Sequence, residues 1–235
     1  MSNGLYETPR LSVVGDRGLL VEYGDTIDPI INKKVISMAM GLEQDTPPGV
    51  IEIIPSYRCL LIVYDPSVTN ASALQESLSS LEKLLTEIEI PPPQRVEIPV
   101  CYGGEFGPDI KFVAKHNGLT VDNVIRLHSE TEYQIFMIGF SPGFPYLGVL
   151  PKELHTPRQK TPRTQVLAGS VGIANEQTGI YPVTSPGGWQ LIGRTPLKLF
   201  DLERSNPFLY KAGDRIKFKS ISPEEYRRLA KKGIK

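Results

Sequence analysis

The spacing of hydrophobic residues near the start of the chain predicts a small α/β domain. Apolar runs at residues 11–14 and 19–23 flank a turn of glycine and charged residues, which is typical of two paired strands. Asp28 followed by Pro29 predicts the start of a helix, and apolar residues continue at three- and four-residue steps to Leu42. An amphipathic helix is therefore expected after a strand pair.

The same kind of patterning continues up to a run of prolines. Residues 50–54 and 60–64 predict two strands, and leucines repeat at helical spacing from Leu74 to Ile88. A further strand is predicted at residues 95–100. Strand, helix, two strands, helix and strand form a split βαβ pattern, so we expect a ferredoxin-like domain. The pattern leaves open which domain holds the last strand.

Three consecutive prolines, Pro91, Pro92 and Pro93, mark the predicted domain boundary. Consecutive prolines cannot continue a helix, and they favour an extended, semi-rigid connector. The sequence therefore predicts an α/β domain at residues 1–93 and a second domain at residues 94–235, with an α+β fold class for the whole chain.

The second half of the chain becomes rich in turns after residue 138. Residues 109–117 and 120–129 predict two short helices, and residues 133–138 predict a strand. Residues 139–196 contain 9 of the 21 glycines and 8 of the 21 prolines, together with the single tryptophan and many Val, Ile and Leu residues. Short apolar runs separated by Gly and Pro turns are typical of a β-barrel or a sandwich.

Composition and charge narrow the class of protein. The 235 residues are 40% hydrophobic and 22% charged, which excludes a disordered chain. The formal net charge is zero, but residues 1–93 hold 6 basic and 13 acidic residues, whereas residues 94–235 hold 20 and 13. A neutral total argues against a nucleic-acid-binding protein. The basic second half favours binding of a small anion or an acidic surface.

The sequence also bears on location. No stretch approaches the roughly 18 apolar residues that are needed to cross a bilayer. The N-terminus has neither the basic start nor the apolar run of a signal peptide. We therefore expect a cytoplasmic protein with no membrane partner.

Three motifs are rejected on chemical grounds. Gly-Phe-Ser-Pro-Gly at residues 139–143 matches a nucleophile elbow, but Pro142 follows the serine and has no N–H for an oxyanion. No P-loop sequence occurs, so a standard P-loop of this chain does not bind ATP. His116, His128 and His155 lack metal-ligand spacing, and no metal site is predicted.

The first candidate for catalysis is His128 with Glu130, where a predicted helix gives way to a strand. A histidine beside a carboxylate can transfer protons during catalysis. A solvated helix end with favourable charges near its terminus is the alternative interpretation, and the sequence leaves both open.

The second candidate is a cluster of cations and aromatic residues in the turn-rich segment. Arginine is suited to bidentate binding of carboxylate or phosphate, and a tryptophan beside paired glycines suits the wall of a binding site. The alternative is a barrel with a core tryptophan and solvated arginines at its rim. The predicted substrate-binding residues are Arg158, Arg163, Gln177, Tyr181, Trp189 and Arg194.

A long, ordered set of motifs in the second half resembles a known family. The set begins with Gly-Phe-Ser-Pro-Gly-Phe-Pro-Tyr-Leu-Gly at residues 139–148 and ends with Leu-Phe-Asp at 199–201. Ala-Gly-Ser-Val-Gly-Ile-Ala at 168–174, Gln-Thr-Gly-Ile-Tyr-Pro at 177–182 and Ser-Pro-Gly-Gly-Trp at 185–189 lie between them. The chain resembles the family that unites the B-type subunit of 5-oxoprolinase, the kinase A inhibitor KipI and chains labelled allophanate hydrolase subunit 1.

The resemblance implies a small N-terminal α/β domain and a C-terminal cyclophilin-like β-barrel. It also implies an ATP-dependent 5-oxoprolinase complex that opens 5-oxo-L-proline to L-glutamate. The complex would contain a second cyclophilin-like subunit, of the C type, and a third subunit, of the A type. On this basis the chain is expected to be inactive alone, and the complex rather than a P-loop here is expected to bind ATP.

Two other functions implied by the resemblance remain open. One is an inhibitor that binds a sporulation sensor histidine kinase, and the other is the first subunit of a urea- or allophanate-type amidohydrolase or carboxyltransferase. The resemblance assigns no catalytic residues, so the candidate site residues rest on their own chemistry.

Overall fold

The computed structural model describes residues 4–232. The chain divides into two compact units, and the division lies between Pro92 and Pro93, inside the proline run. Met1, Ser2 and Asn3, on which the expectation of no signal peptide partly rests, lie outside the described residues. None of the described helices combines the length and the apolar composition that crossing a bilayer requires. The cytoplasmic location stays a prediction from the sequence.

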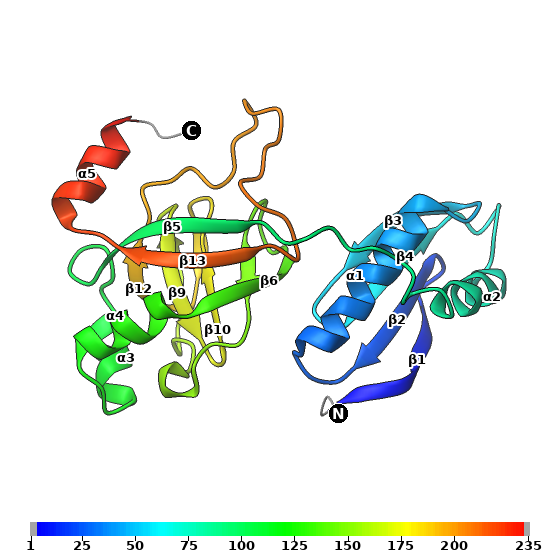
Figure 1. Ribbon diagram of the computed structural model, residues 1–235, viewed down its shortest axis with the longest axis horizontal. Helices are drawn as coiled ribbons and strands as arrows, with labels where there is room; N and C mark the ends of the chain where they lie inside the picture. The colour runs from blue at the N-terminus through cyan, green and yellow to red at the C-terminus, as the bar shows by residue number, and fades with distance from the viewer. Residues whose placement is uncertain (1–3, 233–235) are drawn as a thin grey trace. The chain divides into compact units, whose positions relative to one another are not determined.

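The first unit is a four-stranded antiparallel sheet in the order β1-β2-β4-β3, with α1 packed against it (Figure 1). Strands and helices follow one another along the chain in the order that the hydrophobic pattern predicts. The pattern is informative because one side of each strand and one side of each helix face a common core. The elements are β1 (Leu5–Val14), β2 (Gly18–Gly24), α1 (Pro29–Gln44), β3 (Val50–Pro55), β4 (Cys59–Tyr64) and α2 (Ala71–Glu82).

The start of α1 follows directly from its capping residue. The Asp28 carboxylate accepts a hydrogen bond of 2.7 Å from the backbone N–H of Ile30, which satisfies one of the free donors at the helix start. Proline in the first turn has no N–H that would need a partner. Both features were predicted from the sequence, and both are confirmed.

The ferredoxin-like interpretation of this unit is not confirmed. The predicted last strand, β5 (Arg95–Tyr102), pairs with strands of the second unit instead. The outer position beside β2 is occupied by β1, which comes from the other end of the unit. Strand pairing is a long-range choice that local patterning does not determine, so the mixed α/β composition was predictable and the sheet order was not.

The helix predicted through Ile88 is shorter in the structure. α2 ends at Glu82, and the residues that follow form tight turns in which the N–H of Leu84 bonds to the carbonyl of Leu81. Bonds between residues three apart continue to Glu87, so the leucines still recur at nearly helical spacing. The pattern therefore predicted burial correctly but overstated the length of the α-helix.

The second unit is a closed barrel of seven strands in the order β10-β7-β6-β13-β5-β12-β9. β5 and β13 are parallel, and the other neighbours in the barrel are antiparallel. The barrel strands are β5, β6 (Glu132–Ile138), β7 (Pro145–Leu147), β9 (Ser170–Ala174), β10 (Gln177–Ile180), β12 (Gln190–Arg194) and β13 (Arg215–Ser220). The expected β-barrel is confirmed, and its likeness to cyclophilin stays a prediction.

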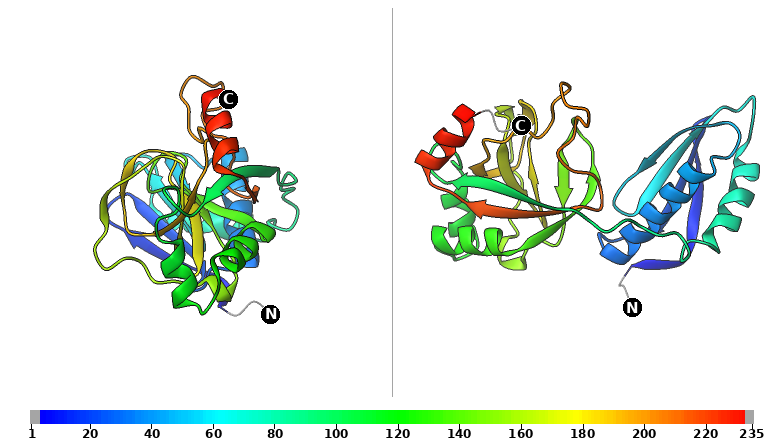
Figure 2. Two further views of the ribbon diagram at one scale, coloured as in Figure 1. Left: turned by 90° about the vertical axis from the view of Figure 1, so that its left-hand side faces the viewer. Right: turned by 45° about the horizontal axis from the view of Figure 1, so that its top comes forward.

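Short helices and one ribbon complete this unit. α3 and α4 lie beside each other on the outside of the barrel, where α4 packs against β13 and α3 against β12 (Figures 1 and 2). β8 and β11 form a separate two-stranded sheet that is not hydrogen-bonded into the barrel. These elements are α3 (Ile110–His116), α4 (Val121–Glu130), the 3-10 turn η1 (Lys152–Leu154), β8 (Arg163–Val166), β11 (Ser185–Gly187) and α5 (Pro223–Lys232).

Two separate groups of side chains fill the second unit. The larger group is aliphatic for the most part and fills the barrel between its strands and α3 and α4. The smaller group is half aromatic and lies beside the β8–β11 ribbon. It consists of Phe144, Val166, Ala174, Tyr181, Trp189 and Leu191.

Candidate functional site

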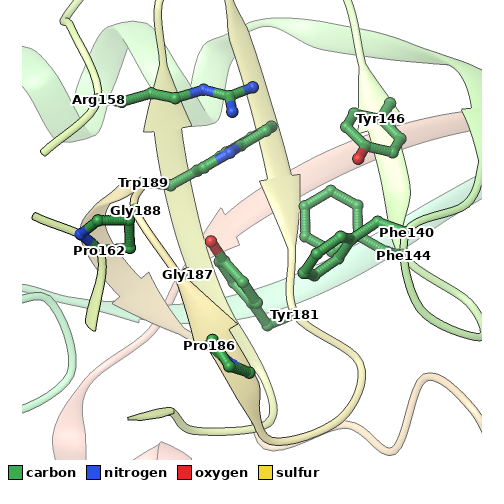
Figure 3. Close-up of a pocket in the computed structure, with 10 residues that line it drawn as sticks. All are labelled: Phe140, Phe144, Tyr146, Arg158, Pro162, Tyr181, Pro186, Gly187, Gly188 and Trp189. Carbon is green, nitrogen blue, oxygen red and sulfur yellow. The ribbon is translucent and has the colours of Figure 1, made fainter. Parts of the chain in front are cut away.

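The three aromatic residues of the smaller group, Phe144, Tyr181 and Trp189, form a wall of a pocket of about 330 Å³ (Figure 3). This volume is at the low end of the range for small-molecule sites, which are mostly apolar with a few polar groups. The pocket is lined by Phe140, Phe144, Tyr146, Arg158, Pro162, Tyr181, Pro186, Gly187, Gly188 and Trp189.

The segment between β6 and β7 supplies one side of this pocket. Its turn brings the N–H of Phe144 to the carbonyl of Ser141 at 3.0 Å, and Gly143 adopts a positive φ of 83°. Phe140 also has a positive φ, 64°, and its side chain remains 64% exposed. A bulky residue is rarely found in this conformation, so the turn holds an aromatic side chain at the pocket instead of in the core.

Phe144 lies at the centre of the aromatic wall. Its ring meets those of Tyr181 and Trp189 edge-on, with centroids 5.2 and 5.4 Å apart, and lies 4.8 Å from that of Tyr146. Edge-to-face contacts of this kind are favourable and define ring orientation. The aromatic wall therefore presents a continuous apolar surface in which the rings brace one another.

The opposite side depends on two adjacent glycines before Trp189. A Cβ at Gly187 would lie 2.4 Å from the Tyr181 hydroxyl, which is closer than real contacts allow. Gly187 therefore lets the β11 backbone approach the tyrosine ring. The predicted role of the paired glycines, a close backbone approach beside the tryptophan, agrees with this geometry.

Two tyrosine hydroxyls lie at the pocket. Burial raises the pKa of Tyr181 above its ordinary value, and it also raises the pKa of Tyr146. In both cases the nearby Arg158 acts in the opposite direction with a smaller effect. Both hydroxyls are therefore protonated at neutral pH and can donate hydrogen bonds.

Arg158 is the charged residue of the pocket lining. Its guanidinium carbon lies 5.9 Å from the centre of the Trp189 ring, and Figure 3 shows the two side chains running alongside each other. This distance is within the range of a cation–π interaction. No carboxylate among the described residues forms an ion pair with Arg158, so its charge is available to an anionic ligand.

Arg163, by contrast, is engaged inside the protein. Its Nη2 donates to both carboxylate oxygens of Asp109, at 2.7 and 2.8 Å, and its Nη1 donates to the carbonyl of Trp189 at 3.3 Å. The two charged side chains are only 27% and 14% exposed. The structure thus places Arg163 in a partly buried ion pair outside the pocket lining.

Of the four remaining predicted substrate-binding residues, two line the pocket and two do not. Tyr181 and Trp189 line the pocket and are almost fully buried. Arg194 donates from Nε to the carbonyl of Ala168 at 2.9 Å and does not line the pocket. Gln177 begins β10 and is also absent from the lining. The structure therefore brings three of the six predicted residues together, counting Arg158.

The predicted proton-transfer pair is not formed. His128 is completely buried, with Tyr102 Oη 2.8 Å from Nδ1 and Thr178 Oγ1 2.8 Å from Nε2. Burial lowers the pKa of His128 to about 3. Glu130 is exposed at the end of α4 and forms an ion pair with Arg126 at 2.9 Å. His128 thus sits in the barrel core, and Glu130 faces solvent, because residues two apart on a helix point in different directions.

Ser141 also departs from the geometry of a nucleophile. Its Oγ is buried and lacks a hydrogen-bond partner, and its N–H bonds to the carbonyl of Gly139 at 2.7 Å. A serine nucleophile needs a base within hydrogen-bonding distance. The rejection of a nucleophile elbow from Pro142 therefore agrees with the structure. Within residues 4–232, no group of three or more His, Cys, Asp or Glu side chains can hold a metal ion.

Two parts of the site were missed in the sequence. Phe140, Phe144 and Tyr146 were noted as a motif but not as pocket residues, although three aromatic residues in a turn-rich segment are a usable signal. Asp109 gave no such signal. It lies 54 residues before Arg163 in sequence, so only the folded chain shows the ion pair.

The fold and the family model agree on the class of protein. The model for the carboxyltransferase domain, subdomains C and D, matches residues 9–210. The chain aligns with the urea amidolyase of K. lactis with a TM-score of 0.79 over 96% of its length and 15% of that chain, and at 23% identity this likeness concerns the fold alone. The class is therefore that of carboxyltransferase-like barrel proteins.

Curated relatives define the family more closely. The chain is 42% identical to the B-type subunit of 5-oxoprolinase of Bacillus subtilis (strain 168), with 92% of this chain and 95% of the relative covered. It is 48% identical to the B-type subunit of 5-oxoprolinase of Haemophilus influenzae (strain ATCC 51907 / DSM 11121 / KW20 / Rd), with 75% and 80% covered. The chain belongs to the family of B-type 5-oxoprolinase subunits.

Two solved structures extend the comparison. TTHA0988 is 35% identical, with a TM-score of 0.79, and the match covers 88% of this chain but only 40% of that one. PH0987 from Pyrococcus horikoshii is 42% identical, with a TM-score of 0.56, and the match covers 92% of this chain and 100% of that one.

A putative urea carboxylase of Emericella nidulans is 26% identical, and this chain spans 20% of its length. Some relatives thus carry this segment within a much longer chain.

Proposed function

We propose that this chain is the B-type subunit of an ATP-dependent 5-oxoprolinase complex and that its aromatic pocket binds the substrate. The observation that carries the proposal is Arg158 at the rim of an aromatic pocket in a chain of this family. The complex converts 5-oxo-L-proline to L-glutamate, with water cleaving the ring amide and ATP hydrolysis driving the reaction.

The chemistry of the pocket matches that substrate in three respects. The flat ring of 5-oxoproline presents apolar faces that can pack against the rings of Phe144 and Trp189. Its carboxylate is suited to the guanidinium of Arg158, because arginine binds carboxylates with two hydrogen bonds. The Tyr146 and Tyr181 hydroxyls supply donors for the ring carbonyl.

The same lining argues that the chain is inactive alone. Among the lining residues that the structure describes, none is an aspartate, glutamate, histidine, cysteine or lysine. Opening an amide ring requires groups that move protons near neutral pH, and the two tyrosines have raised pKa values. We therefore propose that another member of the complex supplies the acid–base groups to this pocket.

The partners we propose are the two named from the sequence, a second cyclophilin-like subunit of the C type and a third subunit of the A type. Relatives in which this segment is only 13–40% of a longer chain support a function together with other domains. ATP is proposed to bind elsewhere in the complex, because a small apolar pocket with a single cation is a poor site for a triphosphate.

The test is reconstitution of the complex and measurement of ATP-dependent glutamate formation. Arg158→Ala should raise KM by about 10-fold or more, because a charged hydrogen bond to the substrate is lost. Lys160→Ala is the matched control, since Lys160 is an exposed cation of the same segment outside the pocket lining. Unchanged KM in Arg158→Ala would contradict the assigned site, and absence of turnover in the native complex would contradict the function.

A urea- or allophanate-type activity is the second candidate. It is favoured by the carboxyltransferase-domain match and by relatives named urea amidolyase at 24–26% identity. The same reconstituted complex should be assayed with urea and allophanate as substrates. Binding to a sporulation sensor histidine kinase stays a prediction from the sequence.

A further inference from the structure

We propose that Asp109 and Arg163 are positioning residues that hold Arg158 over Trp189 at the rim of the pocket. The inference rests on the proposed role of this pocket as the ligand site. It assigns a function to an ion pair that lies outside the pocket lining and that touches no ligand.

Asp109 is unusual in what its carboxylate contacts. It occupies the residue before α3, where an aspartate commonly caps the helix, yet its side chain makes no capping hydrogen bond. Instead, Oδ2 accepts from the N–H of Leu191 at 2.6 Å, and both oxygens accept from Arg163. The carboxylate therefore accepts hydrogen bonds from β12 and β8 and does not cap its own helix.

The turn that carries Asp109 is itself docked tightly on β12. The N–H of Asp109 bonds to the carbonyl of Leu191 at 2.9 Å, and the N–H of Gly103 bonds to that of Ile192 at 3.0 Å. A Cβ at Gly107 would lie 1.9 Å from the Ile192 carbonyl oxygen, so only glycine allows this approach. Asp109 is thus a fixed point on the barrel wall.

The segment from residue 157 to residue 163 is fastened at both ends. Before Arg158, the Pro157 carbonyl accepts from Gln190 Nε2 at 2.9 Å. After it, the Gln159 N–H bonds to the Gly188 carbonyl at 2.8 Å, and Gln159 Nε2 reaches Asp109 Oδ2 at 3.4 Å. Arg163 then closes the segment on Asp109 and on the Trp189 carbonyl.

These contacts hold the backbone segment that carries Arg158. Its side chain is long and exposed and has no ion pair among the described residues, so its direction depends on its backbone and on its contact with the Trp189 ring. The ion pair with Asp109 holds Arg163, and with it the backbone of the segment that carries Arg158. Arg163 also bonds to the Trp189 carbonyl, so the same ion pair holds the backbone of Trp189. A binding group has to be held within a fraction of an ångström to act efficiently.

The experiment uses the single tryptophan as a reporter in the full chain without ligand. Quenching of Trp189 fluorescence by iodide depends on exposure and on nearby positive charge, whereas quenching by acrylamide depends on exposure alone. The ratio of the two quenching constants therefore reports the positive charge near the ring, and the part of it that Arg158→Ala removes is the part that Arg158 supplies. Because no ligand is present, its outcome is independent of whether the pocket binds 5-oxoproline.

The test variant is Asp109→Asn combined with Arg163→Gln, which removes the ion pair without changing the net charge. We expect the ratio to fall about twofold, to the value of Arg158→Ala, and to fall no further when Arg158→Ala is added. The matched control is Glu97→Gln with Lys219→Gln, which removes an exposed ion pair of the same unit and should leave the ratio unchanged.

The outcomes decide the proposal. A ratio equal to the native value in the test variant, or a full further fall on adding Arg158→Ala, would overturn it. If the double variant does not fold, as judged by circular dichroism, Arg163→Lys decides instead. Lysine keeps the charge but lacks the fork that binds both oxygens of Asp109, so a partial fall is expected and a native ratio would overturn the proposal.

Discussion

The Nε2 atom of His128 lies 2.8 Å from the Oγ1 of Thr178, in the core of the barrel. The hydroxyl of Thr178 donates its own proton to the Gly172 carbonyl at 3.0 Å, so its oxygen must accept from the histidine. The proton of the neutral ring is thus on Nε2, and Nδ1 accepts from the Tyr102 hydroxyl at 2.8 Å. Every polar atom of the ring is satisfied without a charge.

This arrangement predicts a pH dependence of stability. His128 has its pKa lowered to about 3 by burial, from an ordinary 6.5, so the unfolded chain takes up a proton at a higher pH than the native chain does. The contribution of the neutral His128 ring to the free energy of unfolding is complete above about pH 6.5 and is lost as the pH falls toward 3. The expected slope is about 1.4 kcal/mol per pH unit within that range.

His128→Gln isolates this contribution from that of the carboxylates. The variant should be less stable than the native chain at pH 7 by about 1–3 kcal/mol, because buried partners lose hydrogen bonds. The difference in the free energy of unfolding between the native chain and the variant should shrink by about 2 kcal/mol between pH 7 and pH 5. Urea unfolding at several pH values measures both quantities, and a gap that does not change with pH would contradict the assignment.

A second prediction concerns the glycines at the pocket. Gly187→Ala should destabilise the protein by about 1–3 kcal/mol, because its Cβ would lie 2.4 Å from the hydroxyl and 2.7 Å from the ring of the buried Tyr181. Gly188→Ala is the matched control, since its Cβ would lie 3.5 Å from Pro162, which is an ordinary contact. Thermal unfolding compares the two variants. Equal stabilities would show that Tyr181 moves freely and that the rings of the aromatic wall do not brace one another.

A third prediction concerns the two units. The buried residues of the first unit form one cluster and those of the barrel form others, with no shared members among the described residues. We propose that residues 93–235 fold alone, as a chain with its own core is able to do. The isolated fragment should unfold cooperatively and keep the Trp189 fluorescence of the full chain. A fragment without a cooperative transition would show that the barrel depends on the first unit.

The sequence was a good guide wherever structure depends on neighbouring residues. The helix start at Asp28, the two short helices before β6 and the turn-rich barrel segment were all predicted, because capping and periodicity act within a few residues. The extent of α2 was overstated, since tight turns continue its apolar spacing. Family membership was also predictable from the motifs between residues 139 and 201.

The candidate site was predicted only in part. Trp189, Tyr181 and Arg158 line one pocket, as a cluster of aromatics and cations in one segment indicates. Arg163 and Arg194 have the same chemistry and the same kind of surroundings in sequence. Their carbonyl and carboxylate partners lie 26 to 54 residues away, so nothing local distinguishes them from Arg158.

The sequence by itself determined the places of α1, α2, α3 and α4, where turns interrupt the barrel, and to which family the chain belongs, whereas α5 was not predicted. The tertiary structure alone decided that β5 joins the barrel, that His128 is a neutral core residue, and that Asp109 pairs with Arg163 and not, among the described residues, with Arg158. The physical reason is the same in each case. Strand pairing, burial and ion pairing depend on groups that are distant in sequence and meet only in the folded chain.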